Sequence, residues 1–325
     1  MTENNHYGIQ IISKEEAITY WQQAENVVLF NHPNYLEVMS NETDWWMGLR
    51  KNVPIIIWPV CKNQANQVSL PPNSFHVGPI WLNDDQQKAI YRWFDDYLNL
   101  SYCFIQAFLK QYGTLNADMP FGMLDIRPFL QYQADHAGTV EMQTIIRYTS
   151  RISGLNHLDD EGIYNLMKRD RRKKIRQQDK RAIYARAYDW TKEELIRFYQ
   201  SFLALKKLND NEGRMLYFKN TLALCDQFDH DILFYRNVET QAAAACYVVL
   251  YSAGIANGIY SLFSDDFRKG GYSPWVMFQL LKSVRDKGCD VFDFNGGNHV
   301  KLAHDKHTYG ALAFPYIRLR ISSHN

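Results

Sequence analysis

Residues 242–298, AAAACYVVLYSAGIANGIYSLFSDDFRKGGYSPWVMFQLLKSVRDKGCDVFDFNGGN, contain the pattern that decides the fold. Residues 242–251 and 255–263 are rich in apolar, aromatic and β-branched side chains, and a short Ser-Ala-Gly stretch separates them. Two such runs around a glycine-containing turn predict an antiparallel hairpin.

The hairpin is followed by a polar, glycine-bearing loop at residues 264–273. Residues 274–287 then carry apolar side chains at helical spacing, and Gly288 is placed to end that helix. Residues 290–294 predict a short strand. The whole segment is therefore predicted to be β-β-loop-α-β.

The loop before the predicted helix is a candidate anion site. Ser273 is predicted to be the N-cap, with Pro274 in the first helical position. The two preceding glycines free the backbone to turn unpaired amide groups toward an anion at the positive end of the helix dipole. We predict that an anion, such as the phosphate of a cofactor, is bound by Arg268, Lys269, Gly270, Gly271 and Ser273.

A second candidate anion site is a run of basic residues. Residues 168–181 carry nine basic and two acidic side chains, a surplus of seven in a chain whose net charge is +1. Such runs are usually solvated helix faces, but like charges at this density repel, and phosphates would neutralise them. With Ile175 as the buried anchor, we predict that a phosphate-bearing ligand is bound by Arg171, Arg172, Lys174 and Arg176. A nucleotide-linked sugar, a lipid diphosphate and a tRNA backbone all fit.

Polar residues crowd into the segment after the last predicted strand. Acid–base catalysis needs a group that can accept a proton and a hydrogen-bond donor or cation that can stabilise developing negative charge. We predict catalytic roles for Asp293, His299, His304 and Lys306, the first three as candidate bases, and substrate binding by Asn295 and Asn298. Asp293 has an alternative interpretation, as a strand-end residue that binds backbone amides. The His and Asp spacing resembles no zinc signature, so no metal is predicted.

The chain contains a faint internal repeat. SKEEAITYW at residues 13–21 and TKEELIRFY at residues 191–199 each begin with the spacing of a capping box. Each is followed by two predicted strands around a polar turn, WWMGL and VPIIIWPV in the first half and DILFY and AAAACYVVLY in the second. This predicts a duplicated unit, although capping boxes and such turns are also common by chance.

Length, net charge and cysteine content further limit the possible domain organisation, partners and location. A length of 325 residues favours two domains, for which we predict the ranges 1–150 and 151–325. The near-neutral net charge excludes whole-chain attraction to nucleic acid or membranes. Five scattered cysteines favour reduced, mostly buried thiols. MTENNHYG at the N-terminus resembles no signal peptide and no apolar run is long enough to span a bilayer, so a cytoplasmic location is predicted.

The loop at residues 268–273 resembles the pyrophosphate loop of the GNAT superfamily, Q/R-x-x-G-x-G/A, with Ser273 in place of the final Gly or Ala. The wider pattern resembles the two-domain Fem-type acyltransferases of that superfamily. Matching stretches are FNHPNYL at 30–36, PPNSFHVGPIW at 71–81, RRKKIRQQDK at 171–180, SDDFRKGGYSPW at 264–275, FDFNGGN at 292–298 and the terminal DKHTYGALAFPY. In the last of these, Asp305 and Tyr309 replace two phenylalanines of the family's F-K-x-x-F-G-A segment.

The resemblance implies a mixed α+β (α/β) fold of two tandem GNAT-like domains, each a largely antiparallel sheet flanked by helices, with the active groove chiefly on the second. It also implies that Lys306, at the family lysine, is the electrostatic stabiliser. The donor is expected to be acyl-coenzyme A, or alternatively aminoacyl-tRNA. The expected acceptor is a small-molecule, nucleotide-linked or lipid-linked amine, such as an amino sugar of surface-glycan biosynthesis. A third hypothesis is a non-catalytic GNAT pair that binds RNA or a metabolite.

Overall fold

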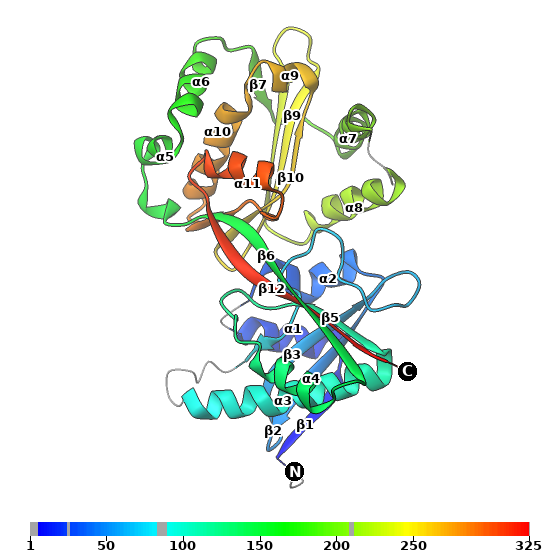
Figure 1. The fold of residues 1–325 in the computed structure, drawn as a ribbon. Coiled ribbons are helices and arrows are strands. Elements are labelled where there is room, and N and C mark those ends of the chain that lie inside the picture. The colour runs from blue at the N-terminus through cyan, green and yellow to red at the C-terminus, as the bar shows by residue number, and fades with distance from the viewer. Residues whose placement is uncertain (1–5, 25–26, 83–89, 208–210, 325) are drawn as a thin grey trace. The chain divides into compact units, whose positions relative to one another are not determined.

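A computed structural model describes residues 6–24, 27–82, 90–207 and 211–324 of the chain. The N-terminal residues 1–5, which carry part of the signal-peptide prediction, lie outside this range. By its contacts the chain divides into two compact units, unit 1 with residues 1–147 and 315–325, and unit 2 with residues 148–314 (Figure 1).

Unit 1 is built on an antiparallel sheet with the strand order β1-β2-β3-β4. Its helices and strands are β1 (Tyr7–Ile12), α1 (Lys14–Gln23), the 3-10 turn Leu29–Asn31, α2 (Pro33–Met39), β2 (Glu42–Arg50), β3 (Val53–Lys62), β4 (Ile80–Trp81), α3 (Ile90–Tyr112), β5 (Thr114–Asp118) and α4 (Arg127–Asp135). The core is aromatic. Trp58 of β3 packs its ring against Phe104 and Phe108 of α3, with ring centroids 5.2 and 5.4 Å apart.

Unit 2 contains six strands, in the order β6-β11-β10-β9-β8-β7, of an eight-stranded sheet whose full order begins with β5 and β12. Its elements are β6 (Val140–Ile152, which begins in unit 1), the 3-10 turn Leu155–His157, α5 (Asp160–Leu166), α6 (Arg169–Asp179), β7 (Tyr184–Ala187), α7 (Lys192–Lys206), α8 (Asn211–Leu224), β8 (His230–Asn237), β9 (Ala243–Ser252), β10 (Ile255–Phe263), α9 (Asp265–Lys269), α10 (Ser273–Asp286), β11 (Val291–Asp293) and α11 (Val300–His307). Figure 1 shows α5, α6 and α10 on one face of this sheet and α7 and α8 on the other.

The predicted hairpin and helix are confirmed. β9 and β10 pair antiparallel through a turn at Ala253 and Gly254, both with positive φ. The apolar positions predicted for α10 are all buried in the core of unit 2, and Gly288, with φ +77°, follows its last turn. Burial of that apolar stripe against the sheet is the main stabilisation of the helix.

Two details of the predicted loop are wrong. Residues 265–269 form the short helix α9, whose N-cap Ser264 accepts a hydrogen bond from the amide of Phe267. Ser273 is the first helical residue of α10, and Tyr272 precedes it without a side-chain cap. This short helix begins with Ser-x-x-Phe and ends with Gly-Gly, all within ten residues. A pattern this short is overlooked when only strands and long helices are sought.

The order of elements repeats along the chain. The series β1 α1 α2 β2 β3 β4 α3 β5 α4 β6 has the same order as β7 α7 α8 β8 β9 β10 α10 β11 α11 β12, apart from the extra helix α9, where β12 is Leu312–Ser323. The two predicted capping boxes differ, however. Ser13 and Glu16 exchange both hydrogen bonds, whereas Glu194, whose amide binds Thr191, turns its carboxylate to Arg236.

The contact-based division differs from the predicted domain ranges at the strand β12. Residues 315–325 were assigned to the second domain, yet Arg318 to Ser322 pair antiparallel with β5 of unit 1. Ile317, Leu319 and Ile321 are buried in the core of unit 1. Conversely, Arg151 and Ile152 of β6 pair with β11 of unit 2. Strand pairing and apolar burial outweigh sequence proximity, so most of β12 belongs to unit 1, while β6 begins in unit 1 and ends in unit 2.

Candidate functional site

The candidate site lies in unit 2 where two strands separate. β10 and β11 are parallel, in register from Ile255 opposite Val291 to Asn257 opposite Asp293, while β10 continues to Phe263. The pairing of β10 with β9 shifts register between Gly258 and Tyr260. In mixed sheets, ligands bind beyond the carboxyl ends of parallel strands, and bulges re-aim the backbone next to such sites.

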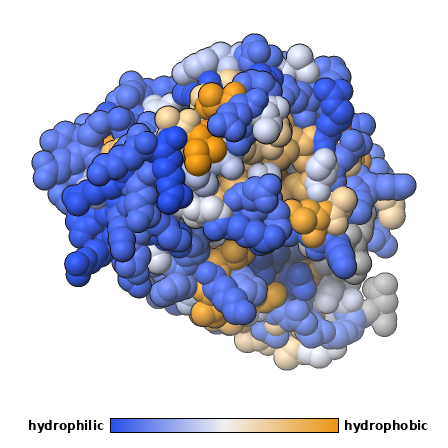
Figure 2. All heavy atoms as spheres, turned by 90° about the horizontal axis from the view of Figure 1, so that it is seen from above, coloured by the Kyte–Doolittle hydropathy of each residue, from blue (hydrophilic) through white to orange (hydrophobic). Residues whose placement is uncertain are grey.

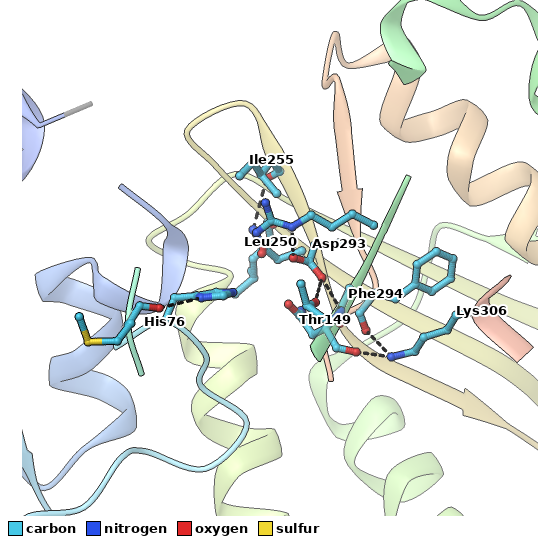
Figure 3. Close-up of polar contacts among 12 residues, drawn as sticks. His76, Thr149, Leu250, Ile255, Asp293, Phe294 and Lys306 are labelled. Atoms are coloured by element: carbon cyan, nitrogen blue, oxygen red, sulfur yellow. Dashed lines mark hydrogen bonds and ion pairs between the residues drawn. The ribbon is translucent and has the colours of Figure 1, made fainter. Parts of the chain in front are cut away.

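Lys306 holds the loop that follows β11. Its Nζ donates to the carbonyl oxygens of Phe294 (3.3 Å), Asn295 and Gly296 (2.6 Å), as Figure 3 shows in part. Asn295 and Gly296 both have positive φ, a backbone shape that turns successive carbonyls toward one point. Burial lowers the pKa of Lys306 to about 8. All three N–H groups of the ammonium are thus engaged by the backbone, and its predicted role as oxyanion stabiliser stays a prediction.

Asp293 is enclosed by donors. It is 1% exposed and accepts from the Thr149 hydroxyl, from Arg151 Nε at 2.6 Å and from the Asn295 amide at 2.8 Å (Figure 3). A buried carboxylate that accepts three hydrogen bonds and balances a guanidinium is poorly placed to take a proton from an amine. This geometry favours the interpretation of Asp293 as a strand-end residue that binds the backbone. The role of Asp293 as a base stays a prediction.

Asn295 and Asn298 bind the backbone on two sides of the loop. Asn295 Nδ2 donates to the carbonyl of Gly258 at the bulge, 3.1 Å away. Asn298 Oδ1 accepts from the amide of Tyr148 at 2.8 Å. Their predicted role in substrate binding stays a prediction, because both side chains already have backbone partners.

His299 and His304 are exposed on α11, with His299 at its N-cap position. In the described part of the chain, no side-chain hydrogen bond or ion pair engages either imidazole. Among the three predicted bases, these two histidines are therefore accessible, whereas Asp293 is buried.

The amides of the predicted donor loop are not free. Gly271 N binds Arg268 O at 3.0 Å and Tyr272 N binds Phe267 O at 3.3 Å, the two bonds of a Schellman C-cap, with Gly271 at φ +75°. The Gly270 amide binds Asp266 O at 2.9 Å. The expectation of unpaired amides at both glycines is wrong, because α9 uses these groups to end. Donor binding by the loop stays a prediction.

The two loop cations share one acid. Arg268 and Lys269 lie 2.6 and 2.7 Å from the carboxylate of Asp265, one helical turn earlier. These contacts hold the pKa of Asp265 below its usual value. Both cations are exposed, and such pairs are weak enough for a phosphate to replace the carboxylate.

The structure brings the two predicted anion sites together. Lys174 of α6 reaches the donor loop, because its Nζ lies 3.3 Å from the position of a Cβ on Gly271. Trp275 of α10 donates to Asp179 of α6 at 2.8 Å. Arg172 and Arg176 both lie over the ring of Tyr164, at 5.8 and 5.3 Å. One basic surface therefore extends from α6 to the start of α10.

Most of this basic surface is uncompensated. Among the described residues, Arg171 is the one member of the nine that forms an ion pair, with Asp305. Ile175 is buried as predicted, and seven of the nine are exposed, namely Lys168, Arg169, Lys173, Lys174, Arg176, Lys180 and Arg181. The face of the molecule in Figure 2 is mostly hydrophilic, interrupted by separate apolar patches.

Tyr309 is a site residue that sequence reasoning missed. Arg171 lies 4.9 Å from the centre of its ring, and its hydroxyl interacts with the side chain of Ser273 at the start of α10. Burial raises the pKa of this phenol above its ordinary value. The signal was available, because Tyr309 is one of the two departures from the family's F-K-x-x-F-G-A segment.

Two cavities of unit 2 lie away from these residues. One, of about 390 Å³, lies between β7 and the end of β8, and the other, of about 500 Å³, lies between α7 and α8. Within the described ranges, no group of three or more His, Cys, Asp or Glu side chains could hold a metal ion.

Comparison with known proteins finds a family model that matches part of unit 2 and solved structures with a similar fold. Residues 169–306 match the model of an acetyltransferase (GNAT) domain. The structure resembles FemX at a TM-score of 0.64 and 12% identity, over 95% of this chain and 96% of that one. It also resembles a tandem GNAT protein from the clavulanic acid biosynthesis pathway, at a TM-score of 0.55 and 11% identity over 98% of each chain. A third similar structure is the C-terminal domain of a putative lysylphosphatidylglycerol synthetase from Agrobacterium fabrum, at a TM-score of 0.54 and 9% identity over 94% of this chain and 92% of that one.

No curated protein matches the sequence. The described helices include none that is both long and apolar enough to cross a membrane.

Proposed function

We propose that this chain, an acyltransferase with two GNAT-type domains, transfers an acyl group from acyl-coenzyme A to the amine of a phosphate-bearing precursor of the cell surface, such as an amino sugar. The separation of the parallel strands β10 and β11 carries the proposal. Beyond Asn257, β10 has lost its partner β11, so its free edge can hydrogen-bond an extended acyl donor.

The donor phosphates are proposed to lie where α6 meets the donor loop. Lys174, Arg268 and Lys269 lie at this junction, and the first of these has no carboxylate partner among the described residues. Because the amides of Gly270 and Gly271 are engaged, side-chain cations have to supply most of the phosphate contacts.

In the proposed reaction, the amine nitrogen attacks the thioester carbonyl, coenzyme A leaves as the thiol, and the amine loses one proton. His304 or His299 is proposed to take that proton and to pass it to the departing sulfur, since both imidazoles are accessible. Lys306 is proposed to act on the oxyanion chiefly through its charge, while it holds the loop after β11 in shape.

A second candidate donor, aminoacyl-tRNA, is favoured by a different observation. Three amides of the donor loop are used in ending α9, which leaves a poor cradle for a compact pyrophosphate. Exposed cations instead extend along α6, whose 11 residues span about 16 Å, a length that matches several nucleotides of a phosphate backbone.

Incubation of the purified chain with a panel of acyl-coenzyme A donors, charged tRNAs and amino-sugar acceptors, followed by mass spectrometry, tests the proposal. The expected result is an acylated amine that needs acyl-coenzyme A and survives ribonuclease treatment. Ribonuclease-sensitive transfer would select the second donor. Absence of transfer from both donor classes, with a folded protein, contradicts the proposed function.

A further inference from the structure

Arg171 of α6 is held by the end of α11. Its side chain is 20% exposed, and its guanidinium pairs with the carboxylate of Asp305. Its Nε donates to the hydroxyl of Thr308 at 2.9 Å, and its Cζ lies 4.9 Å from the centre of the Tyr309 ring. The amide of Lys168, at the N-cap of α6, donates to the carbonyl of Thr308 at 2.9 Å. The first turn of α6 therefore lies against the end of α11.

The residues that meet Arg171 lie on one side of this helix end. Asp305, Thr308 and Tyr309 are spaced i, i+3 and i+4, which places them on one face of a helical turn. The turn continues past the last helical residue, because the amide of Thr308 binds the carbonyl of Asp305 and the amide of Tyr309 binds the carbonyl of Lys306, both at 3.0 Å. One guanidinium thus contacts three side chains of a single turn.

Lys306 projects from the same turn to a different neighbour. Its ammonium binds three carbonyls of the loop after β11 (Figure 3). Asp305 is adjacent to it in sequence, but the carboxylate of Asp305 is paired with Arg171. The end of α11 is therefore held by two neighbours, by α6 through Arg171 and by the loop through Lys306.

Two of the contacted residues are the departures from the family segment F-K-x-x-F-G-A. Asp305 and Tyr309 stand in place of its two phenylalanines. A phenylalanine at position 305 has no charge to pair with a guanidinium, so this ion pair follows from the substitution. Both substitutions flank Lys306 and both meet Arg171, which indicates that the three side chains act together on the turn that carries the lysine.

We propose that Arg171 is a positioning residue that holds Lys306 in place, and not a ligand of a substrate phosphate. By fixing the last turn of α11, it keeps the ammonium of Lys306 against the loop after β11. Phosphate binding is then left to the exposed cations of the same helix, such as Lys174 and Arg176. The expected effect on turnover rests on the proposed function, whereas the effect on the order of this turn does not.

Hydrogen exchange followed by mass spectrometry tests the positioning without any substrate. Arg171→Gln is expected to speed amide exchange severalfold in residues 305–311 and in the loop 294–297, because both lose a fixed neighbour. Asp305→Asn, at a side chain that is 53% exposed, removes the same ion pair from the other partner and is expected to have the same effect. Arg172→Gln, at the next position of α6, is the matched control and is expected to leave exchange in these two segments unchanged.

Steady-state kinetics supply the second readout. Arg171→Gln and Asp305→Asn are each expected to lower kcat about tenfold with the KM of both substrates within about twofold of the parent values. The double variant is expected to lose no more than either single variant, because both changes remove one contact. Arg171→Lys keeps the charge without the planar fork, so its kcat is expected to lie between those of the parent and Arg171→Gln. Arg172→Gln is expected to show the opposite split, a raised KM at nearly parental kcat.

Parent-like exchange in both Arg171→Gln and Asp305→Asn would overturn the inference, whether or not the chain transfers acyl groups. A raised KM at parental kcat in Arg171→Gln would also overturn it, because Arg171 would then be a phosphate ligand. Faster exchange in both variants of a chain that transfers no acyl group would support the positioning of Lys306 and contradict the proposed function, so the two failures are distinguishable.

Discussion

At the scale of single residues, Lys306 is the most informative position, because its ammonium lies against three carbonyls of the loop after β11. We expect Lys306→Met to lower kcat about a hundredfold with both substrate affinities largely intact. Steady-state kinetics with separate affinity measurements check this, with Lys301→Met, an exposed lysine of the same helix, as the control. Wild-type kcat in Lys306→Met would remove the catalytic assignment.

The pH dependence of Lys306 gives a second prediction at this scale. Its pKa, which burial lowers to about 8, means that the ammonium loses its charge as pH rises through about 8. A neutral amine has two N–H donors for three carbonyls and no charge for an oxyanion, so activity is expected to fall above that pH. A pH profile of kcat/KM checks this. A profile of the Lys306→Arg variant that falls at the same pH would show that another group titrates.

Asp293 offers a third residue-scale prediction. Because its carboxylate balances Arg151 in a buried pair, Asp293→Asn is expected to lower the free energy of unfolding by about 3–5 kcal/mol. Urea unfolding measures the change, with the exposed Asp266→Asn as the control. Parent-like stability combined with lost turnover would contradict the structural interpretation and restore Asp293 as a base.

At the scale of elements, Gly271 in the C-cap of α9 adopts a backbone conformation that favours glycine. Gly271 and Gly288 have φ of +75° and +77°, but Lys174 adjoins the first, while nothing lies within 4 Å of the Cβ position of the second. Alanine at either position is expected to cost about 1–2 kcal/mol of stability. Only Gly271→Ala is expected to weaken donor binding, by about tenfold, through displacement of the Lys174 ammonium.

Thermal unfolding and donor binding by calorimetry separate these two effects, with Gly288→Ala as the matched control for backbone strain. Equal donor affinity in the two variants would remove the donor loop from the site.

The basic helix gives a second prediction at the element scale. Arg172→Ala with Arg176→Ala is expected to raise the KM of a phosphate-bearing acceptor by on the order of tenfold, and rising salt should have the same effect on the parent. Lys180→Ala with Arg181→Ala, at the far end of the run, is the charge-matched control. Salt-independent kinetics and a parent-like double variant would return α6 to the status of a solvated helix face.

At the scale of the whole molecule, the place of β12 in unit 1 predicts which unit a substitution in this strand will destabilise. Leu319 of β12 is fully buried in the core of unit 1 although it lies near the C-terminus. Leu319→Ala is expected to cost about 2–5 kcal/mol and to speed hydrogen exchange in α3 and β5 of unit 1. Leu280→Ala in α10 is the reciprocal control, with its effect in β9 and β10. Faster hydrogen exchange in unit 2 on changing Leu319 would contradict the assignment of β12 to unit 1.

The sequence by itself determined the elements whose stability is local. The hairpin of β9 and β10, the apolar stripe of α10 and the capping box of α1 were all predictable, because turn chemistry and 3.6-residue periodicity act within a few residues. The motifs of unit 2 also indicated the GNAT-type domain, which the match over residues 169–306 confirms.

Only the tertiary structure decided which of these residues meet. The pairing of β12 with β5, the contact of Lys174 with Gly271 and the enclosure of Lys306 by carbonyls all join segments that are not adjacent in sequence. The tertiary structure also decided the partners of the donor-loop amides. From the sequence, Gly270 and Gly271 could either end one helix or present free amides at the start of the next. Such choices depend on burial and on satisfying every backbone hydrogen bond at once, and these quantities exist only in the folded chain.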